Sequence, residues 1–321
     1  MTEAETSLTE PSEEELSKAV EEITISTSSS SNNKTMSPTS SVVSLLSEQE
    51  QKALEELLQI MESQKESMTT YQKYFVFTAE PDHGCLIRYL RARDFDVEKA
   101  SKLLKSTLLW LAEYKPQEIT AKMLSKEAAS GKLFIYEKCD KYNRPVVIMN
   151  PGKENTYDNV ANIQLLVYTL CSAVSRMPEG VKKMAWICDF EGYSMKNAPS
   201  LSVCKQTVEV LSSHFVERLG NAYIINAPRA FSWFFKLISP FIPPVTKEKI
   251  KFCYSSNKED MVKFFEPYFD MDTLPQKYGG NAQFEYDHAT FWQEEMKRDD
   301  ERLKKLANVM DIKNLLNLPQ E

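Results

Sequence analysis

The sequence predicts an α/β protein in which a helical N-terminal region precedes a mostly parallel sheet with crossover helices. Between residues 82 and 114, apolar residues recur at helical spacing and no strand-like run interrupts them. From residue 133 onward, short apolar runs alternate with longer helical segments. A repeated order of strand, helix and strand is typical of a parallel sheet with helices in the connections.

The helical region begins with Gln49–Met68, where leucines and a methionine recur at helical spacing. Two further helices are expected between residues 82 and 114, with a break near Phe95. Asp96 is a suitable N-cap for the second of them, because its carboxylate can accept hydrogen bonds from the first free N–H groups. Pro116 ends the helical region.

The sheet is expected to start with two strands that flank a hairpin-like turn over Asp140–Asn143. Asn143 occupies a position in this turn where asparagine tolerates positive φ. The expected strands are Leu133–Tyr136, Pro145–Met149, Met184–Asp189, Ala222–Asn226 and Ile250–Cys253, and the expected crossover helices are Asp158–Arg176, Pro199–Phe215 and Arg229–Ser239.

Four parts are expected along the chain: a disordered acidic and serine-rich tail over 1–48, a helical region over 49–120, an α/β domain over 121–285 and a C-terminal helical extension over 286–321. The tail holds nine acidic residues against two lysines, whereas the remainder balances 37 acidic with 37 basic residues. A folded part without charge bias argues against binding to nucleic acid.

The cysteine and hydropathy patterns point to a soluble cytoplasmic protein. The six cysteines form no C-x-x-C pair and mostly lie in apolar runs, which favours buried reduced thiols. The acidic N-terminus does not resemble a secretory signal. The longest uncharged stretch, 159–175, is diluted by polar residues and favours a buried helix over a membrane span.

The usual signatures of enzymatic chemistry are missing from the sequence. Its eight glycines form no dinucleotide-binding, P-loop or nucleophile-elbow motif. The three histidines stand alone, without a zinc-binding pattern. We therefore expect no catalytic activity, no metal ion and no cofactor.

The segment Arg229–Ser239 is unusually apolar. Seven of the nine residues over Ala230–Ile238 are apolar, so no face of this helix suits water. At about 14 Å it is far too short for a bilayer core of about 30 Å. Two interpretations remain open on the pattern alone: a buried core helix, or a lid between an apolar ligand and a membrane surface.

Four motifs in a fixed order carry a family resemblance: Leu86–Val97, Glu217–Pro228, Pro244–Phe252 and Leu274–Gly280. Together they resemble the CRAL-TRIO lipid-binding proteins, and in particular the yeast-type phosphatidylinositol-transfer branch. The resemblance implies a lipid pocket closed by a gating helix. The residues it assigns to this gate are Phe231, Trp233, Phe234, Phe235 and Leu237.

The resemblance also implies a set of ligand-binding residues. Those matching the inositol-phosphate site are Arg93, Asp140, Pro145, Glu217, Arg218, Thr246 and Lys249. Those matching the wall of a second ligand are Tyr136, Met184 and Trp186. Met184 and Trp186 replace the serine and threonine that bind phosphatidylcholine in the founding members, so that lipid is not expected as the second ligand. A sterol would suit this wall better.

The function implied is a carrier or presenter of phosphatidylinositol that exchanges its lipid at membrane surfaces. Its expected partners are phosphatidylinositol, a transient membrane surface and a lipid-kinase pathway, and the protein is expected to be a monomer with phospholipid as its bound ligand. Two alternatives stay open: a lipid-gated interaction module without transfer, and a carrier of another apolar ligand such as a sterol. A hydrolase with an unrecognised triad is the weakest hypothesis.

Overall fold

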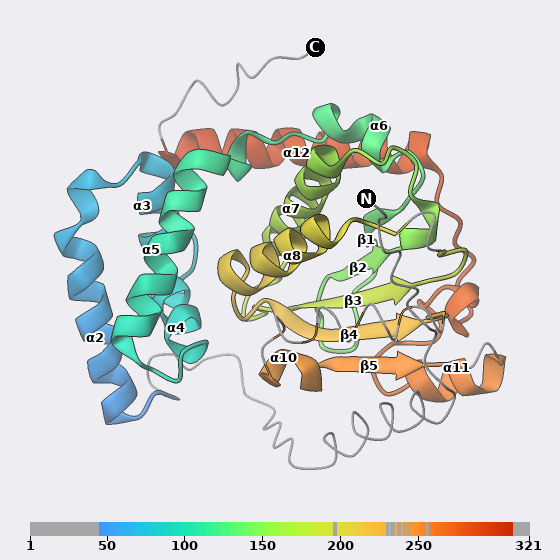
Figure 1. Cartoon of the computed structure of the whole chain (residues 1–321), viewed down its shortest axis with the longest axis horizontal. Coiled ribbons are helices and arrows are strands. Elements are labelled where there is room, and N and C mark those ends of the chain that lie inside the picture. The colour runs from blue at the N-terminus through green and yellow to red at the C-terminus, as the bar shows by residue number, and fades with distance from the viewer. Residues whose placement is uncertain are drawn as a thin grey trace, which may run out of the picture.

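The computed structural model describes residues 45–194, 198–228, 244–254 and 257–310, together with Phe231, Phe235, Ser239 and Ile242. A block of helices lies beside an α/β domain, and a long C-terminal helix runs along both (Figure 1). The predicted class, a helical N-terminal region followed by a mostly parallel sheet, is confirmed. The tail expected over 1–48 lies outside the described residues as far as position 44.

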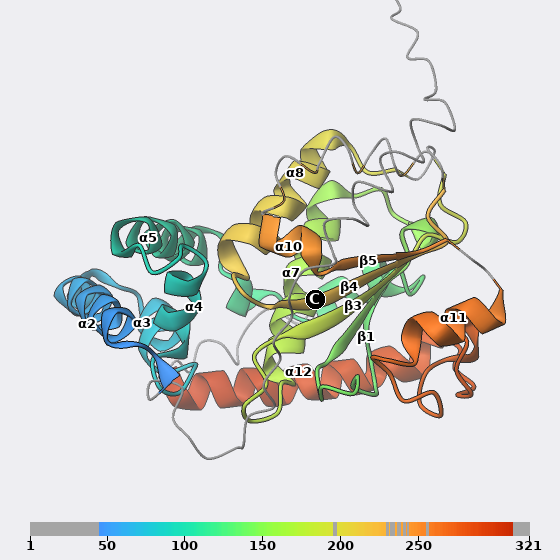
Figure 2. The same ribbon diagram turned by 90° about the horizontal axis from the view of Figure 1, so that it is seen from below.

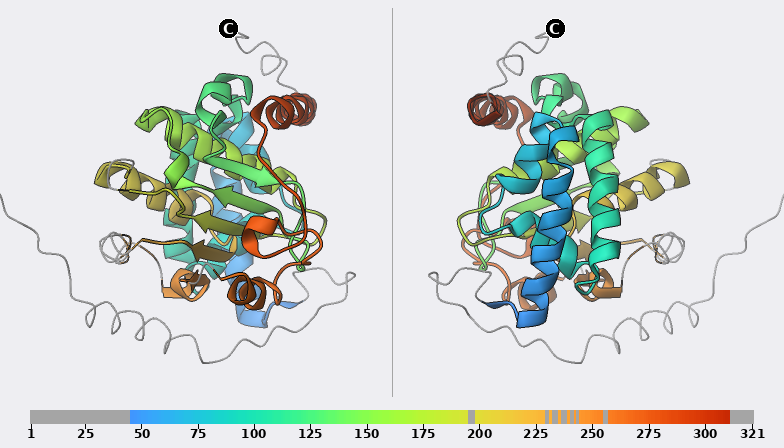
Figure 3. Two further views of the ribbon diagram at one scale, coloured as in Figure 1. Left: turned by 90° about the vertical axis from the view of Figure 1, so that its right-hand side faces the viewer. Right: turned by 90° about the vertical axis from the view of Figure 1, so that its left-hand side faces the viewer.

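The helical block consists of α2 (Glu48–Ser63), α3 (Thr70–Phe77), α4 (Gly84–Arg91) and α5 (Val97–Tyr114). α2 opens with a capping box, because the Ser47 hydroxyl accepts from the Glu50 N–H and the Glu50 carboxylate accepts from the Ser47 N–H. α5 opens at the predicted N-cap, where the Asp96 carboxylate accepts from the Lys99 N–H. α2 and α5 lie side by side (Figure 3, right), and their apolar stripes share one core.

The sheet contains β1 (Leu133–Tyr136), β2 (Val146–Met149), β3 (Met184–Asp189), β4 (Leu219–Ile225) and β5 (Ile250–Cys253), in that spatial order. β1 and β2 are antiparallel, and the remaining pairs are parallel. The turn between β1 and β2 is held by Asp140, whose carboxylate accepts from the N–H groups of Tyr142 and Arg144. Asn143 has a φ of 59°, as the sequence predicted for this turn.

The crossover helices cover one face of the sheet. α7 (Asn159–Ser175) joins β2 to β3, and α8 (Leu201–Glu209) with a π-helical turn (Val210–His214) joins β3 to β4. When successive parallel strands lie next to each other and every crossover is right-handed, all the connections fall on the same face. α7 and α8 accordingly pack on one side of the sheet and α11 (Lys258–Phe265) on the other (Figure 2).

Strand side chains alternate between these two faces. Met184 and Trp186 of β3 belong to the core beneath α7 and α8, whereas Tyr136 of β1 belongs to the core beneath α11. Tyr136 is opposite Val146, which is opposite Ala185, and Ala185 faces away from its neighbours Met184 and Trp186. The expectation that Tyr136, Met184 and Trp186 line one wall is therefore wrong for Tyr136, whose hydroxyl donates to the Thr273 carbonyl at 2.7 Å.

A C-terminal helix, α12 (His288–Met310), spans from the sheet to the helical block (Figure 2). Trp292 is buried and donates its Nε1–H to the Ala121 carbonyl. Glu295, also buried, accepts hydrogen bonds from the hydroxyls of Tyr168 and Ser172 on α7. Near its other end, Ala307 packs against tyrosines of α3. Among the described residues, no helix combines the length and the apolar character needed to cross a membrane.

Candidate functional site: a charged cluster at the amino edge of the sheet

Three charged residues meet where β3, β4 and β5 begin. Lys183 directly precedes β3, Lys249 directly precedes β5, and Glu217 lies two positions before β4. Because these strands are parallel neighbours, their amino ends lie at one edge of the sheet. The Glu217 Oε2 atom lies 3.4 Å from the Lys183 Nζ and 3.7 Å from the Lys249 Nζ. We call Lys183, Glu217 and Lys249 the amino-edge cluster.

The backbone at Glu217 adopts the left-handed conformation, with a φ of 57°. A non-glycine residue in this region carries strain that its surroundings must offset. The helical block holds both neighbours: the Val216 carbonyl accepts from the Arg88 Nη1–H at 2.7 Å, and Arg218 pairs with Glu80 at 2.8 Å. With the chain fixed on either side, Glu217 lies within ion-pair distance of the two lysines.

Arg218 was expected among the headgroup residues, but in the structure its side chain forms its contacts with other residues of the protein. Its side chain is buried, bonded to Glu80 and to the Lys182 carbonyl. Arg88 binds the same Glu80 carboxylate, so one carboxylate holds two guanidinium groups. Burial and the charge of Arg88 lower the pKa of Arg218 to about 10, although Glu80 works against them. This arrangement ties the helical block to the start of β4.

Asp140 and Pro145 also contact other residues of the protein, where they stabilise the β1–β2 turn and the sheet. The Asp140 side chain is fully buried, and its carboxylate binds Arg144 through both the backbone N–H and the side chain. The Pro145 carbonyl accepts the Ala185 N–H at 2.9 Å and so joins β2 to β3. Neither residue contacts the amino-edge cluster through any described hydrogen bond or ion pair.

Arg93 and Thr246 retain groups suited to a ligand. Arg93 is half-buried in the bend between α4 and α5, where its Nη1–H donates to the Ala92 carbonyl. Thr246 is half-buried in α10 (Pro244–Glu248), and its carbonyl accepts the N–H of Lys249. This hydrogen bond holds Thr246 close to Lys249 of the amino-edge cluster.

The cluster combines partial burial with an excess of positive charge. The exposed fractions of the side chains are 43% for Lys183, 24% for Glu217 and 17% for Lys249. Burial lowers the pKa of Lys249 and the like charge of Lys183 lowers it further, whereas Glu217 and Glu248 oppose both. One carboxylate forms ion pairs with both lysines, so the cluster itself carries a net charge of +1. Such a site favours an anion.

The cluster borders an apolar surface. Met184, Leu219 and Ile250, which begin the three strands, contribute to the core under α7 and α8. Two residues of the expected gate join this core: Phe231 packs 4.3 Å from Phe190 and Phe235 packs 5.5 Å from Phe252, measured between ring centroids. The other expected gate residues, Trp233, Phe234 and Leu237, lie outside the described residues.

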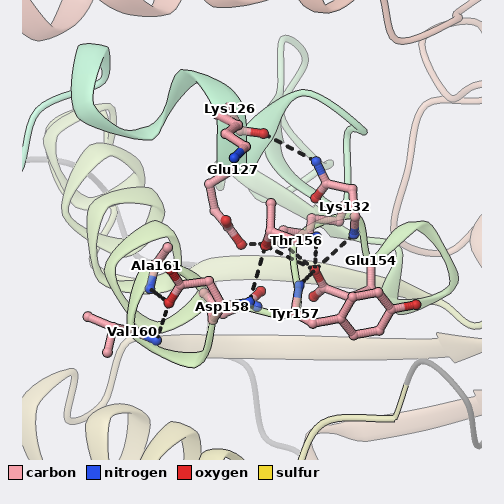
Figure 4. Close-up of polar contacts among 11 residues, drawn as sticks. Lys126, Glu127, Lys132, Glu154, Thr156, Tyr157, Asp158, Val160 and Ala161 are labelled. Carbon is pink, nitrogen blue, oxygen red and sulfur yellow. Dashed lines mark hydrogen bonds and ion pairs between the residues drawn. The ribbon is translucent and has the colours of Figure 1, made fainter.

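A second charged cluster consists of Lys132, Glu127 and Glu154, whose charged groups pair with one another (Figure 4). The buried Lys132 ammonium pairs with Glu127, and with Glu154 at 2.7 Å. Glu154 also accepts the N–H groups of Thr156 and Tyr157 just before α7. Burial works to raise the pKa of Glu154, but the hydrogen bond from Lys132, followed by those from the Thr156 and Tyr157 N–H groups, outweighs it and holds the pKa at about 2. With its lysine fully engaged, this cluster fixes the start of α7 and is not a ligand site.

The described part of the chain offers little support for metal binding or for a cysteine nucleophile. No group of histidine, cysteine and carboxylate side chains there is arranged to hold a metal ion. All six cysteines are free thiols. Burial raises the pKa of Cys188 to about 12, and that of Cys204 to about 11, which disfavours the nucleophilic thiolate.

A polar cluster beside an apolar face, between a helical block and a mostly parallel sheet, suits an amphipathic ligand such as a lipid. The chain matches the CRAL/TRIO domain over residues 129–280 and the CRAL/TRIO N-terminal domain over residues 53–106. It belongs to the CRAL-TRIO family of lipid-binding and lipid-transfer proteins.

Particular relatives are fungal. The chain is 30% identical over 250 residues to the phosphatidylinositol transfer protein PDR17 of Saccharomyces cerevisiae, covering 74% of this chain and 68% of that protein. It is 30% identical over 255 residues to the SEC14 cytosolic factor of Eremothecium gossypii, covering 74% of this chain and 78% of the relative. A CRAL-TRIO domain-containing protein of Schizosaccharomyces pombe is 36% identical over 208 residues, but the match spans 20% of its length.

The fold resembles the crystal structure of Sfh5, with a TM-score of 0.62 and 15% sequence identity over 76% of this chain and 91% of that one. At this identity the likeness bears on the fold alone.

The motif comparison predicted Glu217 and Lys249 as site residues but did not predict Lys183. The sequence did contain a usable signal, because Lys183 directly precedes a predicted strand that is a parallel neighbour of the strand after Glu217.

Proposed function

We propose that this protein binds phosphatidylinositol and carries it between membranes, with the headgroup at the amino-edge cluster and the acyl chains along the face under α7 and α8. One observation carries the proposal: a net-positive, half-buried cluster directly borders an apolar core in a CRAL-TRIO protein. An amphipathic anion matches both surfaces at once. The name of the relative PDR17 describes the same activity for that protein.

Each group in the cluster has a chemical role in this proposal. The ammonium groups of Lys249 and Lys183 compensate the charge of the diester phosphate. Glu217 accepts hydrogen bonds from inositol hydroxyls, and the Thr246 hydroxyl donates one to the phosphate. Arg93 is the remaining candidate for a phosphate contact. Asp140, Pro145 and Arg218 then act indirectly, by holding the strands and the Glu217 segment in place.

Exchange would take place at a membrane surface in the cytoplasm, with the protein as a monomer. A diacyl lipid cannot leave for water at a useful rate, because each buried methylene contributes about 0.8 kcal/mol. The gate must therefore open against a bilayer. A carrier of this kind could also present its lipid to an enzyme of a lipid-kinase pathway.

Substitution of the cluster tests the proposal. We expect Lys249→Ala and Glu217→Ala each to lower phosphatidylinositol transfer between labelled vesicles by about tenfold or more, because a charge-assisted hydrogen bond contributes about 1.5–3 kcal/mol. Thermal unfolding should stay close to wild type, since both side chains are partly exposed. Lys52→Ala, an exposed lysine on α2, is the matched control. Wild-type transfer by both cluster variants would refute the headgroup assignment.

Phosphatidylcholine should be a poor ligand. Met184 and Trp186 are buried on the apolar face and offer no hydroxyl to a second phosphate, and an unpaired buried phosphate is costly. Vesicles containing both lipids, followed by mass spectrometry of the lipids retained by the protein, measure the preference. Robust loading with phosphatidylcholine would contradict this expectation. Loading with phosphatidylinositol but no transfer would favour a lipid-gated interaction module.

A further inference from the structure

The amino-edge cluster contains one more cation than a paired lysine and glutamate would. Glu217 and Lys249 alone would be electrically neutral as a pair. Lys183 approaches the same Oε2 atom, 3.4 Å away, and gives the cluster a net charge of +1. Glu217 cannot compensate both lysines within the cluster, and Glu248 also acts on Lys249 but forms no ion pair with it among the described contacts.

The direction of Lys183 distinguishes it from its neighbour in the chain. The Nζ of Lys182 lies beside Gly84 of α4, 3.3 Å from the position that a Cβ atom would take there, and Glu80 is the largest charge acting on it. Lys182 thus faces the helical block, whereas Lys183 faces Glu217. The two consecutive lysines serve different surfaces.

An ordinary surface ion pair is the simpler interpretation of Lys183, given that 43% of its side chain is exposed. Two facts argue against it. The carboxylate already has a lysine partner that is better buried, with 17% of the Lys249 side chain exposed. The second cation also acts against the first, since Lys183 lowers the pKa of Lys249. An anion bound between the lysines would relieve this repulsion.

We propose that Lys183 is a specificity-determining residue that makes the site select phospholipids with a net negative charge over zwitterionic ones. This inference rests on the proposed function. Phosphatidylinositol is a phosphate diester and phosphatidic acid is a phosphate monoester, and each brings a net negative charge to the net-positive cluster, whereas phosphatidylcholine brings its own cation beside two lysines. Inositol recognition by Glu217 is separate from this charge selection, so Lys183 favours anionic headgroups whether or not they carry inositol.

The test is a competition within one vesicle. The full-length protein is loaded from vesicles holding equal amounts of phosphatidylinositol, phosphatidic acid and phosphatidylcholine, repurified, and its lipids are quantified by mass spectrometry. Because all three lipids come from the same surface, a change in membrane encounter cancels in their ratio. Soluble glycerophosphoinositol is added in a second series, to separate binding of the headgroup from binding of the whole lipid.

We expect Lys183→Gln to lower the ratio of anionic to zwitterionic lipid by about three- to tenfold, as suits a half-exposed charge. Lys183→Arg should keep the ratio, and Lys183→Glu should lower it more than Lys183→Gln. Phosphatidylinositol and phosphatidic acid should both fall relative to phosphatidylcholine. High salt should weaken the preference of the wild type, because an exposed charge is screened. Lys52→Gln serves as the control on a distant surface.

The outcomes separate this inference from the function on which it rests. If the wild type loads phosphatidylinositol and Lys183→Gln keeps the wild-type ratio, the role of Lys183 is refuted and the carrier function stands. A fall in phosphatidylinositol alone, with phosphatidic acid unchanged, also refutes charge selection, because it assigns Lys183 to the inositol ring. If the wild type loads none of the three lipids, both proposals fail. Weak competition by glycerophosphoinositol fits a lipid site, whereas complete displacement would place all recognition in the headgroup and refute the acyl-chain assignment.

Discussion

Single residues between Ser213 and Arg218 join the helical block to the α/β domain. Thr107 of α5 donates to the Ser213 carbonyl, Arg88 of α4 donates to the Val216 carbonyl, and Arg218 pairs with Glu80. The strained residue among them, Glu217, lies in the amino-edge cluster. The position of the Glu217 carboxylate, which we propose accepts hydrogen bonds from inositol, therefore depends on contacts that the helical block makes on both sides of it.

His214 makes this junction sensitive to acid. Its ring stacks on Trp110 of α5, with centroids 4.2 Å apart, and its Nδ1 lies 3.1 Å from the Thr107 hydroxyl. Burial lowers the pKa of His214 from 6.5 to about 4. Between these values the unfolded state binds more protons than the folded state, so stability falls as the pH falls through this window.

We expect the free energy of unfolding to lose about 2–3 kcal/mol from this residue between pH 6.5 and pH 4. His214→Phe keeps a ring against Trp110 but cannot titrate, and Thr107 retains its bond to the Ser213 carbonyl. Urea unfolding of both proteins across this pH range measures the difference. Equal pH dependence in the two proteins would show that His214 does not control it.

At the scale of elements, strands with clear boundaries were predictable. Leu133–Tyr136 and Met184–Asp189 have the predicted ends, because apolar runs there are bounded by polar or turn residues. β4 begins at Leu219, three residues before the predicted start. The prediction missed these residues because Gly220 and Asn221 are poor strand formers. An added Cβ at Gly220 would come within 2.1 Å of the Arg144 guanidinium, so a larger residue would have to displace this side chain from Asp140.

Residues of the candidate site were predictable only where they belong to a recognisable sequence motif. Glu217 and Lys249 came from motifs and do meet in space. Tyr136 came from a motif too, but the match gave no strand register, and register decides the face. Asp140 looks like a ligand-binding group in sequence, although its partner Arg144 is only four residues away in the same turn. Arg218 pairs instead with Glu80, which is distant in the chain. Pairing of this kind depends on tertiary packing.

The gate is the element whose role is most open to test. Phe235 packs against Phe252 of β5 and against Phe231, so its described contacts are with the apolar face. We expect aspartate at both Phe234 and Phe235 to abolish transfer, because charges there oppose contact with lipid and with the core. Circular dichroism must first establish that the variant is folded. Leu109→Asp, an exposed apolar residue on α5, is the control.

Fluorescence of Trp233, in a background without the other three tryptophans, follows the same element directly. A gate that opens against a bilayer should change its emission when vesicles are added. Unchanged emission, together with normal transfer by a folded Phe234 and Phe235 double variant, would make this segment ordinary core.

Over the whole molecule, α12 and the helical block confine the α/β domain from two sides (Figures 1 and 2). α12 contains a charged stretch, Glu294–Lys305, whose composition is typical of a solvated face. Glu295 and Asp299 within it are buried, however: Glu295 pairs with Arg176, and Asp299 with Arg302 at 2.7 Å. The helix thus contributes buried ion pairs as well as apolar contacts, and its burial could not be deduced from charge alone.

The boundary between the tail and the folded protein gives a matched pair of truncations. The tail was expected to end at residue 48, but Leu46 is already buried and Ser47 caps α2. Removing residues 1–44 should leave the melting temperature and lipid binding unchanged, because that acidic, serine-rich segment lacks the apolar residues needed to join a core.

Removing residues 1–48 should instead cost about 2–3 kcal/mol in the free energy of unfolding, from the lost cap and the lost burial of Leu46. Ser47→Ala in the full chain should reproduce about 1 kcal/mol of this loss. Urea unfolding of the two truncations and the point variant measures the three values. Equal stability of both truncations would show that the cap and Leu46 contribute nothing. A large loss on removing residues 1–44 would instead show that the acidic tail itself packs on the folded protein.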